Sequence, residues 1–181
     1  MSIMQFLEQE AKEQQTGQIW DYISASRLSL WSKCPLAFRK RYIDQEPSSP
    51  SPNMFVGKVV HAVLAHIYRH RVAGEVCTAE QLPQFVADAW NKSLQIEPCY
   101  FDDTAQEEKC RYQILDLATA YLGATPLQEE RPIAIEKRYE MPLIDPATGE
   151  DFGIPLVGIV DLLLENEQGR IIVDFKTASC S

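Results

Sequence analysis

The fold is decided by residues 157–177, Val157-Gly-Ile-Val-Asp-Leu-Leu-Leu-Glu-Asn-Glu-Gln-Gly-Arg-Ile-Ile-Val-Asp-Phe-Lys-Thr177. Two apolar runs rich in β-branched residues flank the polar tetrad 166–169, which ends in glycine. This pattern predicts an antiparallel hairpin. In the register that the turn imposes, Asp161 faces Asp174 and Ile159 faces Lys176.

The hairpin gathers charged groups on one face. Side chains alternate along a strand, so Asp174 and Lys176 share a face, and Asp161 joins them from the neighbouring strand. Opposed residues have Cβ atoms roughly 4.5 to 5.5 Å apart, where two carboxylates repel each other. A bound divalent cation such as Mg²⁺ would offset the repulsion, and Lys176 could then steady an attacking water or developing negative charge. The alternative is a solvated sheet face with Lys176 as a salt-bridge partner.

Composition limits the possible functions. The chain has 181 residues, 45% of them apolar and 24% charged, which fits one globular domain. No apolar run reaches the length of a membrane span, and the N-terminus lacks the pattern of a signal peptide, so a cytoplasmic protein without membrane partners is expected. The five cysteines contain no Cys-x-x-Cys pair, which argues against a disulfide framework and a self-contained zinc site.

The net charge of the chain gives no overall attraction to nucleic acid. The formal charge is −9 and the pI is about 4.8, so any such binding must use a local basic patch. Residues 27–43 contain no acidic residue. Their cations are Arg27, Lys33, Arg39, Lys40 and Arg41. This segment is either a phosphate-binding track or a solvated helix face.

The first two thirds of the chain is predicted to be helical. Residues 1–23 are interpreted as an arm or short helix, followed by helices from Ser24 or Ser26 to Lys33 and from Pro35 to about Ile43. In the first of these, Leu28 and Trp31 are expected to be buried. Further helices are expected over 54–72, after a Thr78 capping box with Gln81, and over 104–122.

The central predicted helix carries two stripes. Its apolar stripe consists of Val56, Val60, Val63 and Ile67. Beside it, Gly57 would let another backbone approach closely, and His61 lies one turn further along.

The last third of the chain is predicted to be extended. Residues 133–143, 154–164 and 170–176 are interpreted as three strands, with a turn at 145–149. Helices followed by an antiparallel three-stranded meander give an α+β fold. We expect one domain over 24–181, with a helical part at 24–125 and the meander with its metal site at 126–181.

At this point the ordered motifs resemble a known family. They are Ser24-Ala-Ser-Arg-Leu28 with Trp31, Cys34-Pro-Leu-Ala-Phe-Arg-Lys-Arg-Tyr42, Gly57-Lys-Val-Val-His61, Gly158-Ile-Val-Asp161 and Asp174-Phe-Lys-Thr177. Together they resemble the motifs of RecB-like nucleases in the PD-(D/E)xK superfamily, which includes CRISPR-associated exonucleases and AddB-type nuclease domains. The resemblance implies a restriction-endonuclease-like core.

The family resemblance also implies a site and a chemistry. It implies Mg²⁺- or Mn²⁺-dependent hydrolysis of DNA, with His61, Asp161, Asp174 and the carbonyl of Phe175 as metal ligands and Lys176 assisting the attacking water. Glu136 matches an acidic position on the first strand, or is a surface residue. The basic segment would meet DNA phosphates, and Trp31 or Tyr42 could stack on a base.

Two departures from the family leave the function open. The cysteines that would join Cys34 around an iron-sulfur cluster are absent from this sequence, so no cluster is expected and Cys34 is interpreted as a small buried residue. The family also continues past the Asp-x-Lys motif into a helix and strand, which the predicted fold lacks. Three hypotheses result: a DNA exonuclease acting on single strands or free ends in repair or CRISPR-type defence, a catalytically incomplete DNA-binding or assembly module, and a fragment completed by another chain such as a helicase.

Overall fold

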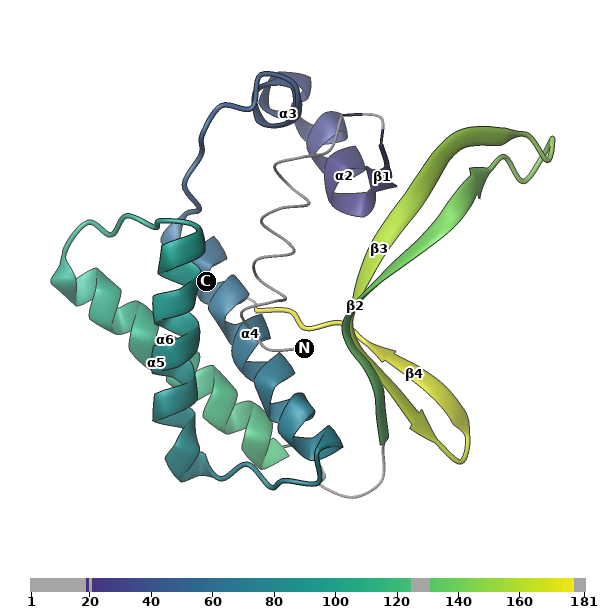
Figure 1. Ribbon diagram of the computed structural model, residues 1–181. Helices are drawn as coiled ribbons and strands as arrows, with labels where there is room; N and C mark the ends of the chain where they lie inside the picture. Colours follow the sequence, from purple (N-terminus) through teal and green to yellow (C-terminus); the bar gives the residue numbers. More distant parts are fainter. Residues whose placement is uncertain (1–18, 20, 125–130, 178–181) are drawn as a thin grey trace. The chain divides into compact units, whose positions relative to one another are not determined.

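The structure is a computed structural model that describes residues 19, 21–124 and 131–177 (Figure 1). The expected N-terminal arm lies almost wholly outside the described residues. The described chain forms two compact units. The first contains residues 49–124, 131–136 and 160–177, and the second contains residues 19, 21–48 and 137–159.

The first unit is built around α4 (Pro52–Val72). The Ser51 side chain accepts a hydrogen bond from the Met54 N–H, so the helix begins two residues earlier than the sequence pattern predicts. The predicted stripe of Val56, Val60, Val63 and Ile67 is buried throughout. Because Val59 and Leu64 are buried as well, α4 is covered on more than one side.

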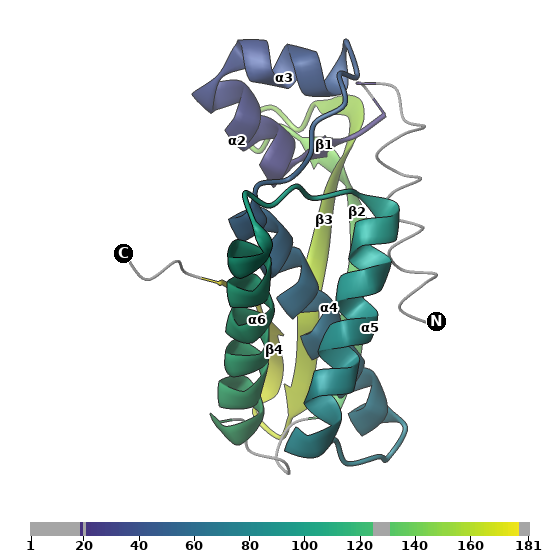
Figure 2. The same ribbon diagram turned by 90° about the vertical axis from the view of Figure 1, so that its left-hand side faces the viewer.

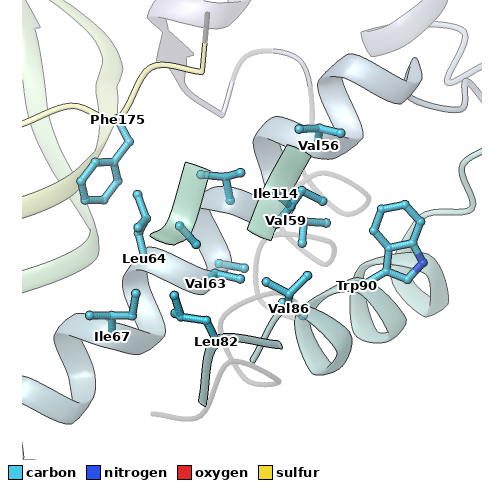
Figure 3. Packing of buried hydrophobic residues seen from close by; sticks show 14 of the residues in the cluster. Val56, Val59, Val63, Leu64, Ile67, Leu82, Val86, Trp90, Ile114 and Phe175 are labelled. Carbon is cyan, nitrogen blue, oxygen red and sulfur yellow. The ribbon is translucent and has the colours of Figure 1, made fainter. Parts of the chain in front are cut away.

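Two further helices cover α4. The Thr78 capping box with Gln81 is confirmed, and it precedes the short η1 (Ala79–Gln81) and α5 (Leu82–Ile96). The third helix is α6 (Thr104–Ala124). Figure 1 places α4 between the α5–α6 pair and the strands of this unit, and Figure 2 shows α4 between α6 and α5. The core contains residues from the three helices together with Leu162, Leu164 and Phe175, so it joins helices to strands (Figure 3).

The strands confirm the α+β class. They are β1 (Ile23–Ser24), β2 (Arg131–Ile144), β3 (Asp151–Asn166) and β4 (Gly169–Val173), in the order β1-β3-β2 with β4 also paired to β3. The β3–β4 hairpin has the predicted register, with Leu162 opposite Val173. At the turn, the Asn166 side chain accepts from the N–H groups of Gln168 and Gly169.

β4 is shorter than predicted. It ends at Val173, so Asp174 and Lys176 lie beyond the paired strand instead of on it. The physical cause is local: the Phe175 N–H donates to the Asp161 carboxylate at 2.7 Å instead of joining a backbone ladder.

The second unit departs from the sequence expectations in three places. β1 was not predicted and pairs in parallel with β3, which makes the sheet four-stranded and mixed. It is followed by α2 (Ala25–Lys33) and α3 (Pro35–Tyr42). Leu28 and Trp31 are about half exposed, against the prediction of burial, because the inward side of α2 is occupied by Arg27. Cys34 is exposed, not buried, and its sulfur caps α3 by accepting from the Ala37 N–H.

Over the part of the chain that the structure describes, none of the helices has both the length and the apolar character that crossing a bilayer requires.

Candidate metal centre

One face of α4 is turned toward the strands of its own unit. Gly57, His61, Ala65 and Arg69 follow one another at intervals of four residues, so they lie along one side of the helix. At Gly57 the hydroxyl oxygen of Thr177 comes close, and it would stand only 3.0 Å from an added Cβ. The expected close approach therefore occurs, although the contact is made by a side chain and not by a backbone.

His61 meets two carboxylates from the strands. Its Nδ1 lies 3.6 Å from Asp161 Oδ1 on β3 and 3.9 Å from Glu136 Oε1 on β2. One ligand atom from each residue can be chosen so that all three lie within 4.8 Å of one another. Within the described residues this is the one group of three or more histidine, cysteine or acidic side chains so arranged.

Glu136 reaches the group through an unusual backbone conformation. Its φ is +46°, a left-handed value that side chains larger than glycine rarely adopt. The preceding residue, Ile135, packs against the core, and Glu136 is itself buried, so two successive strand residues face inward. Strain of this kind is stored at functional sites more often than elsewhere.

Phe175 connects the hairpin to the helix. Its backbone N–H donates to Asp161 Oδ2 at 2.7 Å, and its carbonyl lies 2.9 Å from His61 Nε2. Its ring is buried against Tyr68 of α4 and Tyr121 of α6. The backbone N–H and carbonyl of Phe175 therefore hold Asp161 and His61 in place.

These contacts fix the roles of the two nitrogens of His61. A carbonyl oxygen can only accept, so Nε2 carries the proton that is donated to Phe175. In the neutral ring, Nδ1 then presents its lone pair to Asp161 and Glu136, and in the charged ring it donates to Asp161. An orienting carbonyl behind a histidine is the usual arrangement behind a metal-binding nitrogen.

The pKa values of His61 and Asp161 move in opposite directions. The hydrogen bond that His61 donates to Asp161 raises the pKa of His61 above 6.5, against the effect of burial, and the charges of Asp161 and Glu136 add to the rise. Burial alone would raise the pKa of Asp161, but the hydrogen bonds from His61 and from the Phe175 N–H outweigh it and lower that pKa. Both shifts favour an imidazolium beside a carboxylate when no other cation is present.

Asp174 and Lys176 lie outside this group. They form an ion pair with each other, with Lys176 Nζ 2.7 Å from Asp174 Oδ2, and the side chains are 60% and 79% exposed. The bond to Asp174 raises the pKa of Lys176. Because the Phe175 ring points inward, its two neighbours point outward.

Arg69 also lies near this group, although no sequence pattern pointed to it. Burial lowers the pKa of its guanidinium, while attraction to Glu136 acts in the opposite direction. The available signal was its spacing, since Arg69 lies two turns beyond His61 on the same side of α4. Arg69 thus supplies positive charge near the strained acidic residue of the site.

The donor set fits a divalent cation. Mg²⁺ binds oxygen at about 2.0 to 2.1 Å, so its neighbouring ligands stand about 3.0 Å apart and its opposite ligands about 4.2 Å apart. The separations of 3.6 and 3.9 Å from His61 Nδ1 exceed the neighbouring-ligand distance, so the side chains would have to move slightly toward one another around an ion. Two carboxylates and one neutral imidazole also suit Mn²⁺.

The predicted basic segment divides into a buried and an exposed part. Arg27 is 6% exposed, donates to the carbonyls of Ile19 and Tyr22, and stacks on the rings of Tyr22 and Tyr42. It therefore supports its unit from within and is not part of the exposed basic surface.

The other cations of that segment are exposed. Arg39 pairs with Asp44 and Lys40 with Glu46. An aromatic row accompanies them, in which Phe38 contacts both Trp31 and Tyr42. Trp31 is 53% exposed and so presents much of its surface to solvent.

Comparisons with known proteins identify the family of the chain. A family model of the PD-(D/E)XK nuclease superfamily matches residues 22–181. Over 146 residues the chain is 25% identical to a protein of Bacillus cereus (strain B4264) whose name describes an ATP-dependent helicase/nuclease subunit. That match covers 80% of this chain and 11% of the relative's length. No solved structure matched the chain. Because the family model covers nearly the whole sequence, the chain belongs to the PD-(D/E)XK nuclease superfamily, as its motifs implied.

Proposed function

We propose that the chain is a metal-dependent nuclease that hydrolyses phosphodiester bonds in DNA. The observation that carries this proposal is the meeting of His61, Glu136 and Asp161, which come from α4, β2 and β3. All three residues fall inside the range that the nuclease family model matches.

Mg²⁺ or Mn²⁺ would be held by His61 Nδ1 and by the carboxylates of Asp161 and Glu136. Such an ion supplies Lewis acidity, which makes a bound water more acidic and offsets charge on the phosphate. The carbonyl of Phe175, which the family resemblance implies as a ligand, accepts from His61 in this structure and so acts as its orienting group.

Asp174 and Lys176 are proposed to act at the same centre. They flank Phe175, whose backbone contacts both His61 and Asp161, and their side chains are exposed enough to rotate. In hydrolysis a water oxygen bonds to phosphorus, one phosphorus–oxygen bond to a sugar breaks, and a proton ends on the released hydroxyl. Lys176 would steady the negative charge that develops on the phosphate oxygens.

The exposed part of the basic segment is proposed to bind the DNA backbone. Lys33, Arg39, Lys40 and Arg41 would contact phosphates. Trp31 and Tyr42 would stack on unpaired bases, which favours single strands or free ends and hence an exonuclease. Arg27 would contribute by holding Tyr42 in place.

A partner and a setting are also proposed. The name of the similar Bacillus cereus protein joins a helicase to a nuclease, and this chain spans only 11% of that protein's length. We therefore propose that this nuclease works with a helicase, in cytoplasmic DNA repair or CRISPR-type defence.

A second candidate is a DNA-binding or assembly module that does not cleave. The ion pair between Asp174 and Lys176 favours it, because Asp174 is paired with Lys176 and is not a member of the group of His61, Glu136 and Asp161. In that case the metal centre would stabilise the fold or join the chain to its partner.

The decisive experiment is incubation with end-labelled single- and double-stranded DNA in Mg²⁺, Mn²⁺ or EDTA. Stepwise shortening is expected with either metal and not with EDTA. Asp174→Ala and Lys176→Ala are expected to slow cleavage, while Asp116→Asn, an exposed site on α6, serves as the control. Equal cleavage by Asp174→Ala, Lys176→Ala and the unchanged chain would remove those two residues from the site. DNA binding without cleavage would favour the module.

A further inference from the structure

A second pair of histidines lies on α4, away from the group around His61. His66 and His70 are one helical turn apart, and their Nε2 atoms are separated by 3.0 Å. Two imidazole nitrogens this close must either share one proton between them or bind one cation together.

Glu75 determines which nitrogen of His70 carries a proton. Its carboxylate contacts His70 Nδ1 just beyond the end of α4, where Gly74 turns the chain back with a φ of +80°. An ionised carboxylate can only accept, so Nδ1 is the donor. The lone pair of neutral His70 is therefore on Nε2 and points toward His66. A carboxylate behind a histidine is the arrangement that orients metal-binding imidazoles.

Phe85 of α5 holds both rings from the other side. The ring of His66 meets it edge-on at 4.4 Å, and the ring of His70 stacks on it at 5.4 Å. Both histidines are nevertheless partly exposed, so an ion from solvent can reach them. The two rings are thus held in one orientation while remaining accessible to solvent.

We propose that His66 and His70 bind a late first-row transition-metal ion, such as Ni²⁺, Cu²⁺ or Zn²⁺, through their Nε2 atoms, with water in the other positions. A pair of imidazoles without a carboxylate ligand suits these ions, whereas Mg²⁺ is held mainly by oxygen ligands. With metal–nitrogen bonds of about 2.0 to 2.1 Å, two neighbouring ligands stand about 2.9 Å apart in square geometry and about 3.4 Å apart in tetrahedral geometry. The observed 3.0 Å is closest to the square arrangement, which suits Ni²⁺ and Cu²⁺.

The surroundings of His66 keep its ring available. Burial lowers the pKa of His66, and the neighbouring His70, Arg69 and Lys92 lower it further, against a smaller opposing effect of Asp88. This shift favours the neutral ring, which is the form that binds metal.

The test is equilibrium dialysis of the tag-free chain against Ni²⁺ at pH 7.5 with millimolar Mg²⁺ present. In a His61→Gln background, which weakens the other centre, we expect one tightly bound Ni²⁺ that is lost when His66→Gln or His70→Gln is added. Adding Glu75→Gln should weaken that binding by about 10- to 100-fold. Ni²⁺ should also raise the Tm of His61→Gln and not that of the His61→Gln, His70→Gln double variant.

Two results would overturn the proposal. One is Ni²⁺ binding in the His61→Gln background that survives both His66→Gln and His70→Gln. The other is an absence of Ni²⁺ binding in the unchanged chain, which would leave the pair as an internal hydrogen bond. Glu75 is at an exposed position, so Glu75→Gln should fold normally. It therefore still tests the proposal if a histidine variant fails to fold. The proposal is independent of nuclease activity.

Discussion

At the scale of single residues, the centre balances two carboxylates against an imidazole and a guanidinium. His61 contacts Asp161 and Glu136, and Arg69 interacts electrostatically with Glu136. Without a metal, a proton on His61 supplies the positive charge that a cation would otherwise provide. A metal bound at His61 Nδ1, as proposed, would have to displace that proton.

The raised pKa of His61 predicts a pH-dependent contribution to stability. The contribution is fully present below the unfolded-state value of 6.5 and is lost as pH rises through the higher folded-state pKa. In urea unfolding with EDTA, His61→Gln should therefore cost more stability at pH 5.5 than at pH 8.5.

His66 provides a control of opposite sign. Its pKa is lowered, so the unchanged chain should lose stability as pH falls below 6.5, and His66→Gln should lessen that loss. A cost of His61→Gln that is the same at both pH values would contradict the assignment of its charge.

Sequence patterns located some site residues and not others. Asp161 was proposed as a ligand from the hairpin register, whereas His61 was proposed through the family resemblance, and both roles remain predictions. Glu136 could be recognised only as one of two alternatives, since its positive φ breaks the alternation that strand prediction assumes. Arg69 was not predicted, because a cation near the C-terminal end of a helix usually interacts favourably with the helix terminus.

At the scale of elements, α4 organises the unit and Gly57 sets its distance from the chain beyond β4. An alanine there would gain about 1 kcal/mol in helix propensity but would meet the Thr177 hydroxyl at 3.0 Å. We expect Gly57→Ala to be nearly neutral alone. In a Thr177→Ala background it should stabilise by about 0.5 to 1 kcal/mol, measured by urea unfolding. If Gly57→Ala changed the free energy of unfolding equally with and without Thr177→Ala, the contact between these two positions would not affect stability.

The β3–β4 hairpin should show a sharp contrast between its two faces. Leu162 is fully buried in the core, whereas Ile172 on the paired strand is 69% exposed. Leu162→Ala should cost about 2 to 5 kcal/mol in free energy of unfolding, because it removes apolar contact and leaves a cavity. Ile172→Ala should cost less than about 1 kcal/mol. Similar costs at the two positions would show that the hairpin packs with the opposite face inward.

Helices, turns and strand register were predicted correctly where they depend on residues that are close together in the sequence. The Thr78 box, the α4 stripe and the hairpin register depend on neighbouring residues and agree with the structure. β1 has only two residues, too few for any periodic signal, and the early end of β4 depends on a contact with Asp161. Burial of Leu28 and Trp31 was wrong because it depends on what packs against the helix.

At the scale of the whole molecule, a net charge of −9 must be reconciled with binding to DNA. The exposed cations of α2 and α3 would provide local attraction, so Lys33→Ala and Arg41→Ala should weaken binding. Each should also reduce the slope of log affinity against log salt by about 0.7 to 0.9. Lys109→Ala on α6 makes the same change in net charge and serves as the control. Equal effects of all three substitutions would contradict a local track.

The central claim is that His61, Glu136 and Asp161 form a metal centre. Its most direct test is Mn²⁺ binding, followed by the loss of the free-ion EPR signal, in the unchanged chain and in Asp161→Asn, Glu136→Gln and Asp116→Asn. The structure predicts that Asp161→Asn and Glu136→Gln each weaken Mn²⁺ binding more than about 10-fold, while Asp116→Asn binds normally. Unchanged Mn²⁺ binding in Asp161→Asn and Glu136→Gln would contradict it.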